Sequence, residues 1–128
     1  MRAVDTNVLV RLLTRDDPKQ AAVADDFVEN GAWVSHLVLA EACWVLEAVY
    51  KLDRVRLATA VHMLLNHRSL VIQDSEVCSA ALNHFKAHQR VGFSDCLILE
   101  IARKAGHVPV GTFDQVLSRL PNTQRIRS

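Results

Sequence analysis

The sequence lacks several features that mark large classes of proteins. No apolar run approaches the roughly eighteen residues of a membrane-spanning helix, although half of the residues are hydrophobic. The N-terminus has no basic stretch followed by an apolar one, so no secretory signal is expected. The net charge of +1 gives no bulk signal for nucleic-acid binding, which would need a local patch. Only three cysteines occur, and this odd number in apolar surroundings favours buried, reduced thiols in a cytoplasmic protein.

Hydrophobic periodicity and capping residues predict an alternation of strands and helices within one domain over residues 1–128. The predicted helices cover residues 6–14, 16–31, 37–51, 54–67, 75–89 and 95–106, with a short helical piece at 113–121. The predicted strands cover residues 2–5, 32–34, 69–74, 107–112 and 123–127. The residues expected at or near helix caps are Thr6, Ser35, Asp53 and Ser94.

The alternation of short apolar strands with helices predicts an α/β fold, with a parallel sheet covered on both faces. In such open sheets, functional sites gather beyond the carboxyl ends of the strands. Asp5 stands at the carboxyl end of the first predicted strand, which we expect to be buried. The position of this acid therefore indicates chemistry as well as structure.

Four acidic residues have unusually apolar neighbours in the sequence. Asp5 and Asp114 each follow a predicted strand, Glu41 lies within "LVLAEACWVL", and Asp95 opens "DCLILEIA". Four converging carboxylates would repel one another, and a Mg²⁺ or Mn²⁺ ion removes that conflict because it favours oxygen ligands. Such an ion polarises phosphate and lowers the pKa of a bound water, which suits phosphodiester hydrolysis.

Each acid also has an interpretation that needs no shared site. Asp5 and Asp114 can cap the helices that follow them, and Asp95 can interact with the dipole of its own helix. Glu41 lies in mid-helix, so it cannot be a cap, but it can be a solvated residue at the edge of an apolar face. One shared site explains the four positions more economically than four separate causes.

Four motifs, in the same order along the whole chain, resemble those of PIN-domain nucleases, and specifically of VapC-type toxins from bacterial or archaeal toxin–antitoxin pairs. They are "VDTNVLVRLL", "LAEACWVL", "FSDCLILEIARKAG" and "VGTFDQVL". The Asp-Thr-Asn of the first motif and the Thr-Phe-Asp of the last are the most specific. The resemblance implies a PIN-like three-layer α/β/α sandwich with a central, mainly parallel sheet.

The resemblance further implies a Mg²⁺- or Mn²⁺-dependent endoribonuclease. It places the catalytic and metal-binding acids at Asp5, Glu41, Asp95 and Asp114. It places polar residues that orient carboxylates or water at Thr6, Asn7 and Thr112. A plain capping role remains an alternative for Thr6. The partners implied are an RNA substrate, a small antitoxin protein that blocks the acidic site, and a second copy of the chain in a homodimer, with no membrane.

Contact with RNA phosphates would require local cations. Arg11 and Arg15 lie four residues apart on the first predicted helix and share a face. Arg90 lies in the loop just before Asp95. These three arginines are the candidate RNA-binding residues, and solvated surface arginines are the alternative.

For the other polar and aromatic residues we expect ordinary surface, core or interface positions. His84 and His88 have a spacing that can hold zinc, but without a Cys or an acid to complete the set we expect surface or loop histidines. Glu47 and Glu100 lie on no motif, and we expect both to face solvent. Aromatic side chains are expected in the core or at an interface rather than on a base-stacking platform; they are Trp33, Trp44, Phe27, Phe85, Phe93 and Phe113.

Two rival functions remain open at this point. A signalling receiver domain is also α/β with an acidic Mg²⁺ site, and Asp74 could be its phosphate-accepting residue. That class needs a lysine after a late strand, where this chain has Asp114 instead. A PIN fold that binds without cleaving is the second rival, against which the presence of all four acids argues.

Overall fold

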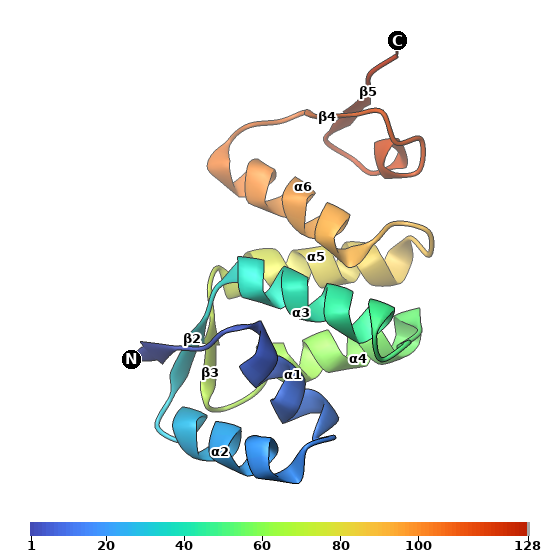
Figure 1. The fold of residues 1–128 in the computed structure, drawn as a ribbon. Helices are drawn as coiled ribbons and strands as arrows, with labels where there is room; N and C mark the ends of the chain where they lie inside the picture. Colours follow the sequence, from blue (N-terminus) through green and yellow to red (C-terminus); the bar gives the residue numbers. More distant parts are fainter. Residues whose placement is uncertain (128) are drawn as a thin grey trace. The chain divides into compact units, whose positions relative to one another are not determined.

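Pairs of helices connect the strands in the N-terminal part of the chain (Figure 1). The computed structural model describes residues 1–127, and the chain divides into two units, Met1–Ser75 and Glu76–Ser128. All strand pairs in the described residues are parallel, which confirms the predicted α/β fold with parallel sheet. We expected one central sheet, whereas hydrogen bonds join the described strands as one sheet of three and one of two.

The first unit contains a three-stranded sheet and four helices. Its strands are β1 (Arg2–Ala3), β2 (Ala32–Val34) and β3 (Leu70–Ile72). Its helices are α1 (Thr6–Thr14), α2 (Pro18–Val28), α3 (His36–Ala48) and α4 (Arg54–Leu65). Helix α1 packs on α2 and α3, and α4 packs against β3 and α3.

One prediction about the strands of this unit was wrong. The order is β1-β2-β3, and the register pairs Ala3 with Trp33 and Trp33 with Val71. β1 is therefore an edge strand, and both of its residues are exposed, although we expected a buried strand there. Val4, which follows the strand, is buried and continues the core.

Side-chain caps fix where the helices of the first unit begin. Ser35 Oγ accepts a hydrogen bond from the backbone N–H of Val38, and Asp53 Oδ1 accepts one from Arg56 N–H. Both caps were predicted, and each satisfies a backbone donor that the first helical turn leaves without a partner. The helices consequently begin at the residues that the sequence indicates.

Helix α3 buries one face and exposes the other. Its buried residues are Leu39, Ala42, Cys43 and Leu46. Their spacing of three and four residues is that of one helical face, which packs on the rest of the unit. Glu41 lies off this face and is exposed.

The second unit contains two helices and a two-stranded parallel sheet. Its elements are α5 (Ser75–Ala87), α6 (Phe93–Ala105), β4 (Val110–Thr112), the 3₁₀ turn η1 (Leu117–Arg119) and β5 (Thr123–Arg125). Phe85 of α5 and Phe93 of α6 pack edge to face, with ring centroids 6.0 Å apart. This aromatic pair lies in the core that joins the two helices.

The start of α6 differs from the prediction. The cap is Gly92 and the helix begins at Phe93, so Ser94 already lies in the first turn and does not cap it. Gly92 has no side chain that could accept a hydrogen bond, and the structure shows no side-chain cap there. Helix α6 ends at Gly106, whose φ of 86° is the left-handed conformation that glycine adopts without strain.

The three cysteines, Cys43, Cys78 and Cys96, are buried and form no disulfide, as predicted. No helix of residues 1–127 is both long enough and apolar enough to cross a bilayer.

Candidate metal-binding acidic site

Asp5 stands two residues beyond β1 and caps α1. Its backbone is extended, and Oδ1 accepts a hydrogen bond of 3.2 Å from the backbone N–H of Val8. The capping interpretation of Asp5 is therefore correct. Capping occupies one lone pair of one oxygen, and a carboxylate has about four lone-pair sites, so the same side chain can also bind a cation.

Glu41 is joined to the N-terminal motif by Thr6. The Thr6 hydroxyl donates a hydrogen bond of 2.8 Å to Glu41 Oε2. The contact links the first turn of α1 to the middle of α3, two helices that pack together. Thr6 thereby fixes the direction of the Glu41 carboxylate, which is what a group that orients a metal ligand must do.

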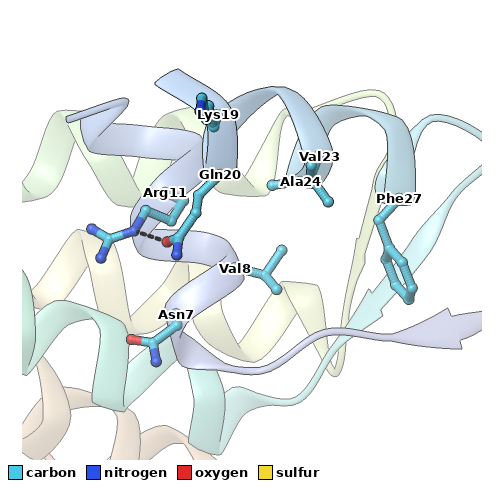
Figure 2. A pocket seen from close by; sticks show the side chains of 8 residues that line it. All are labelled: Asn7, Val8, Arg11, Lys19, Gln20, Val23, Ala24 and Phe27. Carbon is cyan, nitrogen blue, oxygen red and sulfur yellow. Dashed lines mark hydrogen bonds between the residues drawn. The ribbon is translucent and has the colours of Figure 1, made fainter. Parts of the chain in front are cut away.

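Asn7 lies one residue beyond this contact and is exposed. It lines a pocket of about 350 Å³ between α1 and α2, together with apolar residues of both helices (Figure 2). Figure 2 shows the hydrogen bond from Arg11 Nε to Gln20 Oε1, 2.6 Å long, that connects the two helices at this pocket.

The second unit holds the other two predicted acids as an interacting pair. Asp95 lies in the first turn of α6 and is half-buried. Burial raises the pKa of the Asp95 carboxyl above its ordinary value, and the negative charge of Asp114 raises it further. Both effects disfavour the ionised form of Asp95, so a cation placed beside the pair would lower the free energy of the charged state.

Asp114 follows β4 and organises the turn after it. Its Oδ1 accepts hydrogen bonds from the backbone N–H groups of Val116, at 2.7 Å, and Leu117, at 3.3 Å. The capping interpretation is correct here too. Thr112 Oγ1 accepts a 2.9 Å hydrogen bond from the Asp114 backbone N–H. Thr112 therefore positions the main chain of Asp114 rather than its carboxylate.

The predicted site residues fall into two groups. The first unit brings Thr6 and Glu41 into contact and places Asp5 directly before Thr6. The second unit pairs Asp95 with Asp114. Within either unit, no three His, Cys, Asp or Glu side chains of residues 1–127 are arranged to hold a metal ion. A site formed by all four acids stays a prediction.

Two of the candidate RNA-binding arginines already have acidic partners in the first unit. Arg11 Nη1 lies 2.9 Å from Asp16 Oδ1, and Arg15 Nη2 lies 2.6 Å from Asp25 Oδ2. These hydrogen-bonded partners raise the pKa of both guanidinium groups; for Arg11 the largest cause is the hydrogen bond to the Tyr50 hydroxyl. Their charges are thus partly neutralised within the protein.

Glu100 does not face solvent, and the prediction for it was wrong. It is buried, with its side chain 4% exposed, and its two oxygens contact His84 Nε2 at 2.7 Å and Arg103 Nε at 2.6 Å. His84 is consequently a half-buried partner of an acid on α6 rather than a surface or loop residue. Glu47 is exposed, as predicted.

The aromatic residues divide between the core and the surface. Phe85 and Phe93 are buried, as predicted for core residues. Trp44 and Phe113 are 68% and 69% exposed, so neither is a core residue. Both lie near predicted acids in the sequence. Trp44 follows Glu41 by three residues, and Phe113 directly precedes Asp114.

Comparison with known proteins gives one match. A family model described as the PIN domain matches residues 2–122, which is nearly the whole chain and includes all four predicted acids. No curated protein and no solved structure matches the chain.

Proposed function

The chain belongs to the PIN-domain family, whose members are typically metal-dependent nucleases, and from that premise we propose that it is a Mg²⁺- or Mn²⁺-dependent endoribonuclease. The observation that carries the proposal is the pair formed by Asp95 and Asp114. Burial and the charge of Asp114 act against the ionised form of Asp95, and a nuclease site needs such carboxylates together with a divalent cation.

The donor set fits a hard divalent cation. All four predicted ligands offer carboxylate oxygens, which Mg²⁺ and Mn²⁺ prefer over the softer nitrogen and sulfur ligands of zinc or copper. The predicted ligands are Asp5, Glu41, Asp95 and Asp114. When bound, such an ion supplies positive charge that stabilises the charge developing on a phosphodiester and makes water a better nucleophile.

The protein's own groups have distinct tasks in this proposal. Thr6 holds the Glu41 carboxylate in one direction through its hydroxyl. The backbone N–H groups of Val116 and Leu117 hold Asp114 through one oxygen, so that the other oxygen can face a ligand. Preorganised carboxylates of this kind do not have to reorient during the reaction, which lowers its barrier.

We also propose a biological setting. The motifs support the role of toxin in a type II toxin–antitoxin pair, with RNA as substrate and a small antitoxin protein as partner. A homodimer is the proposed assembly. Substantial apolar exposure on α3, at Leu37 and Trp44, is compatible with a protein partner on that face.

Cleavage of single-stranded RNA, assayed with and without Mn²⁺, tests the proposed activity. We expect Mn²⁺-dependent products from the unaltered protein and none from Asp5→Asn purified in the same way. Exposed Glu47 provides the matched control, because Glu47→Gln removes an acid outside the site and should keep full activity. Equal cleavage by the protein and Asp5→Asn would reveal a contaminating nuclease, and absence of cleavage would favour a PIN fold that only binds.

A further inference from the structure

A second concave site lies in the second unit, lined by cationic rather than acidic residues. Its volume is about 240 Å³. The residues that line it come from the end of α5, the loop before α6 and the turn η1; they are His88, Gln89, Arg90, Val91, Val116 and Arg119. No acidic side chain lines the pocket, so it presents positive charge at neutral pH.

The two arginines of this pocket differ from three other arginines of the chain. Arg11, Arg15 and Arg103 each form a salt bridge with an acid of their own unit. Arg90 and Arg119 are exposed, and no salt bridge pairs either of them with an acid in residues 1–127. Two guanidinium groups that line one hollow without internal counter-ions have several N–H donors available for an oxyanion.

The pocket borders both acids of the second unit. Val116 lines it, and the backbone N–H of the same residue donates the 2.7 Å hydrogen bond to Asp114 Oδ1. On the other side, Val91 lines it and is followed by Gly92, where an added Cβ would lie 4.0 Å from Asp95 Oδ2. The pocket lining therefore includes one residue that is hydrogen-bonded to Asp114 and one that is the chain neighbour of Gly92, which lies close to Asp95.

We infer that this pocket, through Arg90 and Arg119, binds a backbone phosphate of the RNA next to the phosphodiester at the acidic site. The inference rests on the proposed function for the identity of the substrate. Acids alone repel RNA, so a strand that reaches them must be held by cations close by. Arg11 and Arg15 are already paired with acids, whereas Arg90 and Arg119 line a pocket that has no acidic residue in its lining.

RNA binding by the full-length chain in EDTA tests the pocket without any cleavage. The probe is a fluorescein-labelled single-stranded RNA, and anisotropy is measured over a series of salt concentrations for Arg90→Gln, Arg119→Gln and the double variant. Each single change should weaken binding about three- to tenfold at low salt. Each should also reduce the slope of log K against log salt by about 0.7, the value for one phosphate contact on a single strand.

Two further variants separate charge from structure. Arg68→Gln removes an exposed arginine of the first unit and should change neither affinity nor slope. Arg119→Lys keeps the charge and should keep most of the salt slope, whereas a role limited to folding would not follow charge in this way. Thermal melting should show every variant within about 2 °C of the unaltered protein, as expected for exposed residues.

A second arm distinguishes RNA from free phosphate. Inorganic phosphate is titrated into the unaltered protein and the double variant, and its binding is measured by calorimetry. Arginine-dependent phosphate binding with an unchanged RNA salt slope would overturn the inference in favour of a small-anion site. Unchanged RNA binding by the double variant overturns it in any case. Arginine-dependent RNA binding without Mn²⁺-dependent cleavage would instead uphold the pocket and refute the nuclease.

Discussion

Replacing Glu100 by glutamine removes the negative charge from the side chain that joins α5 to α6. In the structure the two carboxylate oxygens contact His84 Nε2 at 2.7 Å and Arg103 Nε at 2.6 Å. Glutamine keeps the size and shape of the side chain, but its NH₂ group cannot accept a hydrogen bond. The amide oxygen accepts one N–H without the assistance of a charge, and the NH₂ group can contact His84 only by donating to the other tautomer of its ring.

The magnitude follows from the burial of the three side chains. A hydrogen bond to a charged group contributes about 1.5–3 kcal/mol to stability. Glu100 is 4% exposed, but the Arg103 side chain is 49% exposed, so solvent screens that part of the interaction. We therefore expect Glu100→Gln to lower the free energy of unfolding by about 2 kcal/mol. For a domain of this size, that corresponds to a decrease in Tm of roughly 8 °C.

Urea denaturation followed by circular dichroism measures this loss, with Glu47→Gln as control. Glu47 is an exposed acid on a helix, and its replacement should change stability by less than about 0.5 kcal/mol. If both variants unfold at the same urea concentration as the unaltered protein, the contacts of Glu100 contribute nothing measurable. The assignment of this acid as a structural link between the two helices would then be wrong.

Three other predictions concern single groups. Metal-free Asp95→Asn should be more stable than the unaltered protein at pH 7, because burial and an acidic neighbour raise the pKa of this carboxyl. Because the pKa of Asp95 is raised in the folded protein, the unaltered protein loses stability as pH rises through that pKa. The advantage of the variant in thermal melts should therefore disappear below about pH 4, the ordinary aspartate pKa, where Asp95 is protonated in both the folded and the unfolded state. Thr6→Val should reduce the cleavage rate about tenfold while Thr6→Ser restores it, because the hydroxyl that orients Glu41 is lost and regained. Ser35→Ala should cost about 1 kcal/mol of stability on urea denaturation, whereas Ser94→Ala should cost less than about 0.5 kcal/mol because it caps no helix.

Local signals in the sequence were enough to place most elements. Ser35 and Asp53 stand just before apolar helical patterns, and the structure confirms both as caps. Strand ends and helix caps both depend on a few neighbouring residues. The sequence could therefore also place Asp5 and Asp114 just beyond strands. The resemblance to PIN-domain motifs then gave these positions a chemical meaning that spacing alone could not.

Contacts between distant residues were beyond the reach of sequence patterns. Glu100 and His84 are sixteen positions apart, and their pairing depends on which faces α5 and α6 turn toward each other. The gathering of Arg90 and Arg119 around one pocket depends on the path of the chain after β4 in the same way. The exposure of both residues of β1 was likewise not visible in the sequence, and the start of α6 depended on a glycine cap without a side chain.

The central proposal is that the predicted acids bind a divalent ion, and a double-mutant cycle on Mn²⁺ affinity tests it most directly. Mn²⁺ binding is measured by electron paramagnetic resonance for the unaltered protein, Asp5→Asn, Asp95→Asn and the double variant. Ligands of one ion are coupled, so we predict that each single change weakens binding and that the two losses do not add. Additive losses, or undiminished Mn²⁺ affinity in either single variant, would contradict a shared site.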